Sequence, residues 1–402
     1  MRITYKSLLL LGLVVLLIAM TGCEYDAVKP LWEEPFTLPD PPVIESMDPS
    51  AGIPGANSIG IVGENFASTI DSVRVYFGNV EAEVLNVSST RIEVRRPNLV
   101  SEGTTVSVSS FNAYEAARYE DYRMDNVVDE WGVFAGTITV IGTAAVDKDE
   151  NVYAFKKIPR VMYKIAPDGT QTEIGYPAKL IYDMKVGPDG NLILMLKNKK
   201  VMIMDVNTGE ETLWGEMPKN ATYGDFDQNG NFFSAGSKTE MMVLPHDGGS
   251  YQTGDFKDDE IFCVRVFDNA VYALAQLKRP DEDHPEWAIW KMPILDANGS
   301  LGDPAVYLNW AETGDYAEST PNYFTFSKDG ICYVGTDNEN PILMVQPDGQ
   351  MDTLYKDILP SPATDLIWGN GNYMYQIIQS DDIKFRRIDM GAEGAPYFGR
   401  TL

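Results

Sequence analysis

Four residues near the middle of the chain have the types and spacing of calcium ligands. In the stretch DFDQNG, Asp225, Asp227, Asn229 and Gly230 follow the order in which calcium-binding loops present oxygen atoms before a sharp turn. Such a loop closes with a bidentate glutamate at its twelfth position, and that position holds Gly236. The flanks carry aromatic residues, glycines and short apolar runs without a helical period, which predicts strands. We therefore interpret the stretch as a turn between strands, and we expect no bound metal or cofactor.

Basic residues form a second candidate set, this time for an anionic ligand. They gather in the loops that we place between the second and third strands of four consecutive repeats. The set is Lys156, Lys157, Arg160, Lys197, Lys199, Lys200, Lys238, Lys278 and Arg279. A cation about 4 Å from a carboxylate gains roughly 1 kcal/mol in water and roughly 4 kcal/mol in a partly shielded cleft. The alternative is that these are solvated loop residues balancing nearby carboxylates.

Aromatic residues lie in or beside the same loops. Flat aromatic faces next to polar groups suit sugar rings, which stack their C–H faces on them. The candidates are Tyr176, Trp214, Trp287, Trp310 and Tyr316. Aromatic residues at such positions also pack between neighbouring sheets, so a structural role stays open. The two long segments 275–290 and 309–324 are further candidates, because long loops on a rigid scaffold often carry function.

The sequence pattern does not bring catalytic residue types together. The two histidines, His246 and His284, fall on opposite faces of the predicted fold, so neither a Ser-His-Asp triad nor a histidine-rich metal site is expected. Asp258, Asp259 and Glu260 could do acid/base or metal chemistry, although acidic loops are common in this chain. It has 59 Asp and Glu against 32 Lys and Arg, which argues against nucleic acid as a partner. We expect a binding protein rather than an enzyme.

An internal repeat supplies the elements that position these loops. One series of turns recurs at 147, 187, 227, near 269, 327 and 369, and a second series is centred on Gly169, Gly209, Gly248, Gly299, Gly349 and Gly394. Asp-Gly and Asn-Gly turns between apolar runs predict β-hairpins. Two hairpins in each unit of about 40 to 50 residues give six units of four antiparallel strands.

Strands such as NLILML are apolar on consecutive positions, so both of their faces must be covered. Stacked blades do this, and we predict a six-bladed β-propeller over residues 126–402. The tight turns share one face of the ring, and the variable loops share the opposite face, where we place ligand binding. Segments 131–137 and 395–401 are similar, and either could supply the closing outer strand. The repeat AVDKDENVYAF resembles NHL-type propellers, a resemblance that implies architecture rather than activity.

A smaller all-β domain precedes the propeller, over residues 42–124. Val73, Val75 and Phe77 alternate with polar positions, and seven such strands suit a two-sheet sandwich of immunoglobulin type. The segment resembles the IPT/TIG family through Pro49, Gly52, Gly63, Asn65, Phe66, Phe77, Gly78, Pro97 and Gly103. Members of that family serve as spacers or interaction modules without catalytic residues. We interpret the domain here as a spacer.

The N-terminus predicts export. Arg2 and Lys6 precede a short apolar run and the sequence MTGC, so residues 1–22 have the features of a lipoprotein signal peptide. MTGC resembles a bacterial lipobox, which implies lipidation at Cys23. An ordinary secretory signal is the alternative. Residues 23–41 form a proline-rich tether. Cys263 and Cys332 lie in apolar runs, where we expect free buried thiols.

This order of tether, spacer and propeller resembles the surface glycan-binding lipoproteins of Bacteroidota. The resemblance implies an outer-membrane lipoprotein at the cell surface or periplasmic face, a polysaccharide or oligosaccharide ligand, and an outer-membrane transporter complex as partner. The residues themselves support a ring-shaped ligand that carries negative charge. A protein-interaction scaffold of the envelope and a calcium-dependent lactonase-like hydrolase are the alternatives.

Overall fold

The computed structural model describes residues 40–396, apart from 112, 133, 135–139, 370 and 379–384. The predicted signal segment, Cys23 and the tether up to residue 39 lie outside the described residues. The described chain is all-β, as predicted. Its helices are single 3-10 turns: η1 Ile70–Ser72, η2 Pro188–Gly190, η3 Trp310–Glu312 and η4 Gly314–Tyr316. None of the described helices is long and apolar enough to cross a membrane.

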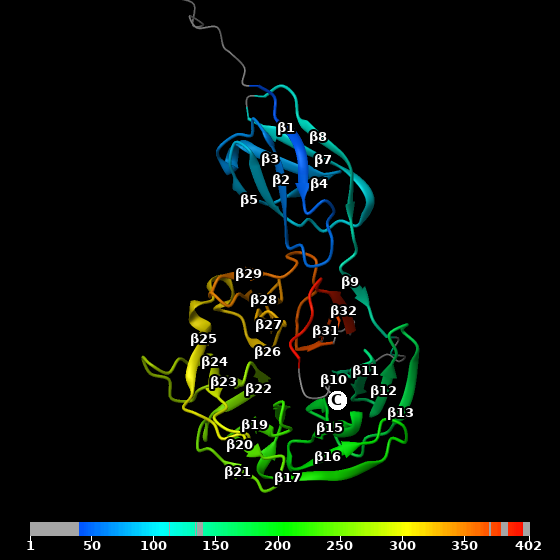
Figure 1. Ribbon diagram of the computed structural model, residues 1–402, viewed down its shortest axis with the longest axis vertical. Coiled ribbons are helices and arrows are strands. Elements are labelled where there is room, and N and C mark those ends of the chain that lie inside the picture. Colours follow the sequence, from blue (N-terminus) through cyan, green and yellow to red (C-terminus); the bar gives the residue numbers. More distant parts are fainter. Residues whose placement is uncertain are drawn as a thin grey trace, which may run out of the picture.

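The N-terminal domain is a sandwich of two four-stranded sheets (Figure 1), with strand orders β1-β2-β6-β5 and β4-β3-β7-β8. Its strands are β1 Val43–Asp48, β2 Ser58–Glu64, β3 Val73–Phe77, β4 Val80–Ala82, β5 Val84–Val87, β6 Arg91–Arg95, β7 Ser101–Ser110 and β8 Ala117–Met124. Val73, Val75 and Phe77 are fully buried between the sheets, as their alternation predicts. The domain has eight strands where seven were predicted, because the short β4 follows β3 directly through a turn at Gly78.

The C-terminal domain contains six four-stranded antiparallel sheets arranged in a ring, which are the predicted propeller blades (Figure 1). Blade one is β10 Ile141–Val146, β11 Val152–Lys156, β12 Val161–Ile165 and β13 Gln171–Gly175. Blade two is β14 Asp183–Val186, β15 Leu192–Met195, β16 Asn198–Met204 and β17 Glu211–Ala221. Blade three is β18 Tyr223–Phe226, β19 Phe232–Gly236, β20 Thr239–Leu244 and β21 Tyr251–Gln252.

Blade four is β22 Glu260–Phe267, β23 Ala270–Gln276, β24 Trp287–Pro293 and β25 Ala305–Asn309. Blade five is β26 Pro321–Phe326, β27 Cys332–Thr336, β28 Ile342–Val345 and β29 Met351–Thr353. Blade six combines β30 Asp365–Trp368, β31 Tyr373–Ile377 and β32 Phe385–Asp389 with β9, Val128–Glu130. The innermost strands contact one another in sequence, and β30 contacts β10, so the six sheets form a complete ring.

Strand β9 closes the ring from the N-terminal side. It pairs antiparallel with β32, with Val128 opposite Ile388. The amide of Trp131 continues this ladder by donating to the carbonyl of Phe385 at 2.9 Å. The closing strand therefore lies directly before segment 131–137, outside both predicted segments, and only Trp131 of that segment joins the ladder. Because the fourth strand of blade six comes from there, the predicted sixth hairpin at Gly394 does not form, and this residue bridges to blade five instead.

Residues 227–231 form a turn between β18 and β19, as predicted from the sequence. The Oδ1 atom of Asp227 accepts hydrogen bonds from the amides of Asn229 and Asn231, each at 2.9 Å. Asp225 is not part of this turn, because it lies buried in β18, where the amide of Val266 donates to its carboxylate at 3.0 Å. Turn chemistry rather than calcium binding explains the residue types.

A specific junction joins the sandwich to blades five and six. The side-chain amide of Asn57 donates to Asp352 Oδ2 at 2.5 Å and to the carbonyl of Thr353 at 2.8 Å, while its oxygen accepts from the amide of Tyr355 at 2.8 Å. The hydroxyl of Tyr355 accepts from the amide of Gly55 and donates to a backbone carbonyl of blade six, both at 2.7 Å. The sandwich is therefore docked on the ring through directional bonds.

Candidate ligand-binding site

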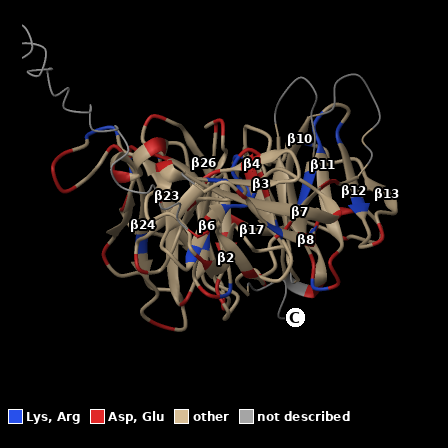
Figure 2. Cartoon of the chain, turned by 90° about the horizontal axis from the view of Figure 1, so that it is seen from above, with Lys and Arg blue, Asp and Glu red and all other residues tan. Residues whose placement is uncertain are grey.

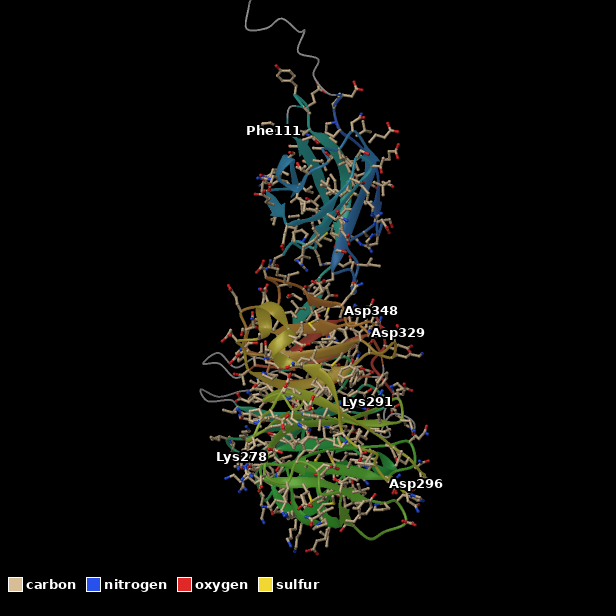
Figure 3. All side chains as sticks on the ribbon, turned by 90° about the vertical axis from the view of Figure 1, so that its left-hand side faces the viewer. Phe111, Lys278, Lys291, Asp296, Asp329 and Asp348 are labelled. Atoms are coloured by element: carbon tan, nitrogen blue, oxygen red, sulfur yellow. The ribbon has the colours of Figure 1, made fainter. Side chains whose placement is uncertain are left out.

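The propeller presents two chemically different faces. Turns between the first and second and between the third and fourth strands of each blade lie on one, which we call the tight-turn face. Loops between the second and third strands and the connections between blades lie on the other, the variable-loop face. In the edge-on view of Figure 3, Lys278 lies on one side of the ring, and Asp296, Asp329 and Asp348 lie on the other.

A polar pocket of about 510 Å³ opens on the variable-loop face at blade four, and we call it the blade-four pocket. Its lining comes from the connection into β22 and the loop between β23 and β24: Lys257, Asp258, Asp259, Leu277, Lys278, Arg279, Asp281 and His284. The loop after β23 is one of the two long segments expected to carry function. Lys278 and Arg279 were predicted as ligand-binding residues.

Asp259 organises this pocket. Its backbone carbonyl accepts from the amide of Lys238 at 2.8 Å, and its Oδ1 atom accepts from the amide of Lys278 at 3.0 Å. Lys238 belongs to the β19–β20 turn of blade three and has a left-handed backbone, with φ of 54°. Through Asp259, the fold brings together three predicted residues, Lys238, Lys278 and Arg279, at the boundary between blades three and four.

His284 and Asp281 form an exposed pair at the rim of the pocket. The ring Nδ1 of His284 lies 2.7 Å from Asp281 Oδ1, which also accepts from the amides of Asp283 and His284. The side-chain hydrogen bond with His284 holds the pKa of Asp281 below its ordinary value. The imidazole also stacks on Trp290, with ring centroids 5.9 Å apart. The contact with Asp281 and the stacking on Trp290 together fix the orientation of the His284 ring.

The cations of the blade-four pocket are available to a ligand. Among the residues that the structure describes, the side chains of Lys257, Lys278 and Arg279 form no ion pair, whereas Asp281 is engaged with His284. A carboxylate or sulfate on a ligand would find up to three charge-assisted donors here. The aspartates beside them would accept hydroxyl groups.

The remaining predicted basic residues do not form one cluster with these. Lys156 is buried at the end of β11, while Arg160 donates to the carbonyl of Ala178. Lys197, Lys199 and Lys200 are exposed on blade two, and the ammonium of Lys197 lies 5.4 Å from the ring centre of Tyr182. Figure 2 shows blue positions around β11 and β12, apart from blade four.

Four of the predicted aromatic residues have packing or hydrogen-bonding roles in the fold. Trp214 packs edge-on against two phenylalanines of blade three, with centroids 5.5 and 5.6 Å away, and Trp287 packs on Phe262 at 4.9 Å. Trp310 is buried and donates its Nε1 hydrogen to the carbonyl of Ser319 at 2.8 Å. Tyr316 is buried and donates to Thr353 at 3.0 Å. Trp214 and Trp287 therefore pack from strands, whereas Trp310 and Tyr316 anchor the long segment 309–324.

Exposed aromatic surface on the variable-loop face lies instead at the connection between blades one and two. Tyr176 is 72% exposed and donates to Glu173 at 2.7 Å. Tyr182, which the sequence did not single out, is 40% exposed beneath the ammonium of Lys197. Tyr182 lies one residue before β14, so the sequence pattern does not distinguish it from the buried residues of that strand.

The axis of the ring contains buried charges that sequence reasoning also missed. The ammonium of Lys185 lies 2.9 Å from Asp183 and donates to the hydroxyl of Tyr323 at 2.7 Å. A second pair joins Arg265 and Asp225 at 3.3 Å. These residues sit in runs such as YDMKV and VRVF, where a charge flanked by apolar residues on an innermost strand is the available signal.

Asp365, on an innermost strand of the ring, has a strongly raised pKa. It is buried at the start of β30, and burial, followed by the charge of Asp183, raises its pKa to about 7. Burial lowers the pKa of Lys157, and the charge of Asp365 opposes this shift. Among the described residues, no group of three or more histidine, cysteine, aspartate or glutamate side chains is arranged to hold a metal ion. Cys263 and Cys332 are free buried thiols, as predicted.

Comparison with known proteins supports this architecture. Residues 42–117 match the IPT/TIG domain. No curated protein matches the chain in sequence. The fold is similar to that of an auxiliary nutrient binding protein from Bacteroides ovatus ATCC 8483, at 14% identity and a TM-score of 0.52, covering 88% of this chain and 99% of that one. These values show a shared fold.

Two further solved structures have a similar fold. An auxiliary nutrient binding protein from Bacteroides thetaiotaomicron VPI-5482 is 12% identical with a TM-score of 0.54, covering 88% of this chain and 98% of that one. The calcium-binding protein regucalcin from Agrobacterium tumefaciens str. C58 is 14% identical with a TM-score of 0.50, covering 67% of this chain and 97% of that one. The similarity to the Bacteroides proteins thus covers most of the chain, whereas regucalcin covers a smaller share.

Proposed function

We propose that this chain is a non-catalytic nutrient-binding protein of the bacterial envelope that holds a carbohydrate carrying carboxylate or sulfate groups in the blade-four pocket. The observation that carries the proposal is the gathering of Lys257, Lys278 and Arg279, without ion pairs among the described residues, around a pocket of about 510 Å³. Protein pockets for small ligands have volumes of this order. The aspartates of the pocket would accept hydrogen bonds from sugar hydroxyls.

The whole-chain similarity to two auxiliary nutrient binding proteins supports the same role. Under this proposal, lipidation at Cys23 would hold the protein in the outer membrane, where it could pass ligand to a transporter complex. Replacing Cys23 with alanine should release the protein from membranes, and continued membrane association would contradict the anchor.

Binding of oligogalacturonate and of sulfated oligosaccharides, with unsubstituted oligosaccharides as comparison, tests the pocket by calorimetry. The double variant Lys278→Ala/Arg279→Ala should weaken binding of the charged probe by roughly tenfold or more, because each lost contact contributes about 1 kcal/mol even in water. Binding of the unaltered protein should also weaken as salt is raised, since screening reduces the attraction.

The double variant Lys199→Ala/Lys200→Ala is the matched control, because it removes the same charge from exposed positions of blade two. Equal losses in the two variants would contradict the pocket and indicate attraction by the whole face. No binding of any charged probe would contradict the proposed function and favour a protein-interaction scaffold. Chelator-sensitive lactone hydrolysis would contradict the non-catalytic role.

A further inference from the structure

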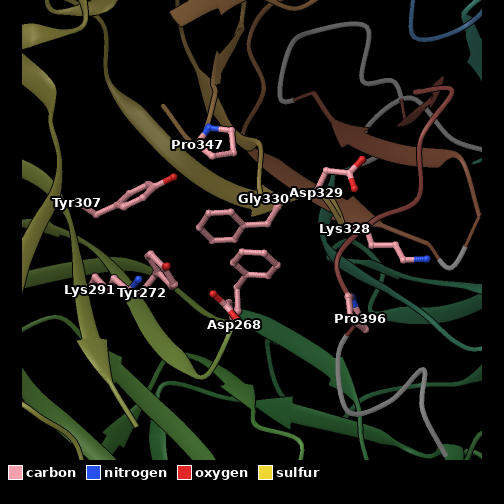
Figure 4. Close-up of a pocket in the computed structure, with 11 residues that line it drawn as sticks. Asp268, Tyr272, Lys291, Tyr307, Lys328, Asp329, Gly330, Pro347 and Pro396 are labelled. Carbon is pink, nitrogen blue, oxygen red and sulfur yellow. The ribbon is translucent and has the colours of Figure 1, made fainter. Parts of the chain in front are cut away.

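A second cleft of the propeller lies on the opposite, tight-turn face. It has a volume of about 600 Å³ and lies between blades four and five (Figure 4). The turns β22–β23, β26–β27 and β28–β29 contribute Asp268, Asp329 and Pro347, while Tyr272, Lys291 and Tyr307 come from the outer part of blade four. We call this the inter-blade cleft. It shares no residue with the blade-four pocket.

Four aromatic rings build one wall of the cleft. Phe267 stacks parallel on Phe326, with centroids 4.7 Å apart and planes 13° apart. Tyr272 packs against Phe326 at 4.8 Å and against Tyr307 at 5.1 Å, edge to face. Phe326 and Tyr272 are buried, whereas Phe267 and Tyr307 are only partly buried. The two buried rings therefore hold the two accessible rings in fixed orientations, which lowers the entropic cost of stacking a ligand on them.

Polar groups surround this aromatic wall on two sides, as Figure 4 shows. Lys291 and Tyr307 lie on one side and Lys328 and Asp329 on the other, with Asp268 below. The ammonium of Lys291 lies 5.5 Å from the ring centre of Tyr272, and Lys328 is paired with Glu393 at 2.7 Å. Asp268 is exposed in a turn with left-handed backbone, φ of 44°. Because Glu393 neutralises Lys328, Lys291 remains against Asp268 and Asp329, so the cleft offers both donors and acceptors and has no net attraction for an anion.

We propose that the inter-blade cleft is a binding site for an uncharged pyranose unit. The accessible faces of Phe267 and Tyr307 would take the C–H face of the sugar, and Asp268, Lys291 and the Tyr307 hydroxyl would bond its hydroxyl groups. Charge-assisted bonds to a carboxylate and an ammonium are the stronger kind of hydrogen bond. The volume accommodates one or two sugar rings, within the range of small-molecule sites. This site does not depend on the function proposed for the blade-four pocket.

The proposal is tested by saturation-transfer NMR and calorimetry on the whole mature chain. The probes are the methyl pyranosides of glucose, galactose, mannose and xylose and the corresponding neutral oligosaccharides. Tyr307→Ala removes one of the two accessible rings, and Asp268→Asn removes a charged acceptor while keeping a residue that tolerates positive φ. Each variant should weaken binding of a neutral sugar by roughly fivefold or more, since one such contact contributes about 1 kcal/mol.

Tyr114→Ala is the matched control, because it removes an exposed tyrosine from the sandwich domain. It should leave neutral-sugar binding unchanged, and Tyr307→Ala should leave binding of oligogalacturonate unchanged. The inter-blade cleft is rejected if no neutral probe binds saturably, or if both cleft variants retain wild-type affinity. Equal weakening by Tyr114→Ala would also overturn it. Circular dichroism and thermal unfolding establish that each variant is folded.

Discussion

Arg95 of the sandwich and Asp352 of blade five lie 2.9 Å apart, from Nη1 to Oδ1, across the boundary between the two domains. The Nε atom of Arg95 also lies 3.0 Å from Glu83, which in turn receives the ammonium of Lys356 at 2.9 Å. Two charged residues of each domain therefore form a chain of ion pairs with alternating sign of charge, and this chain crosses the boundary twice. Together with the hydrogen bonds of Asn57, this network fixes the position of the sandwich on the ring.

Asn57→Ala should weaken the docking of the two domains. Its side chain makes three hydrogen bonds to blade five, and loss of a partly buried amide of this kind costs about 1–3 kcal/mol. We expect a larger radius of gyration in small-angle X-ray scattering and faster proteolysis near residues 125–131. Arg91→Ala, which breaks an exposed ion pair with Asp48 inside the sandwich, is the control. An unchanged scattering curve for Asn57→Ala would contradict a directed junction.

Arg387→Ala should destabilise the ring where it closes. The guanidinium lies 3.7 Å from the ring centre of Trp131 and 4.4 Å from that of Tyr373, and it bonds Asp129 of β9 at 3.1 Å. Loss of these contacts should lower the free energy of unfolding by about 1–3 kcal/mol in urea titrations. Arg74→Ala removes an exposed pair with Glu81 and should cost less than about 1 kcal/mol. Equal effects would mean that Arg387 does not secure the closing strand.

Comparing Gly209→Ala with Gly190→Ala separates the energetic cost of an unfavourable backbone conformation from the cost of steric crowding. Both glycines have positive φ, 72° and 74°, where an L residue loses about 1–2 kcal/mol. A Cβ at Gly209 would approach the carbonyl oxygen of Ile174 in blade one, whereas nothing lies within 4 Å of a Cβ at Gly190. Gly209→Ala should therefore destabilise the protein by at least about 1 kcal/mol more in chemical denaturation. Equal destabilisation would contradict close packing of blades one and two at this turn.

Asp365→Asn should remove a pH-dependent cost of folding. Burial raises the folded pKa of Asp365 to about 7, above the unfolded value near 3.8. Between these values the unfolded chain loses a proton that the folded chain keeps, so this residue lowers stability as pH rises from about 4 to 7. The variant should gain roughly 1–3 kcal/mol over wild type at pH 8 and little at pH 4, measured by urea unfolding. The same gain at both pH values would contradict titration of Asp365.

Much of the fold could be predicted from the sequence, because turns leave local signals. Asp227 and its counterparts at a fixed spacing defined the hairpins, and the alternation of Val73, Val75 and Phe77 defined a sheet packed on one side. The source of the closing strand was left open between two segments, because pairing between distant parts of the chain leaves no local pattern.

The candidate sites were harder to predict, because residue type does not tell a loop anchor from a ligand contact. In the sequence, Trp310 and Tyr316 are aromatic residues within a polar segment, but in the fold both are buried. Asp268 and Asp329 both line the inter-blade cleft, although they are about sixty positions apart in the sequence. Each belongs to a hairpin turn of a different blade. Only the stacking of neighbouring blades brings such residues together.

The pairing of Val128 with Ile388 also has a consequence for biogenesis. During synthesis, β9 emerges before β32 and cannot pair with it until the strands of blades one to five have been made. Blades one to five contain all of their own strands, whereas blade six cannot be completed by a chain that stops before Phe385. A truncated product would keep an open sheet edge, the kind of surface that invites aggregation and degradation. Ring closure thus requires that synthesis has proceeded at least through β32.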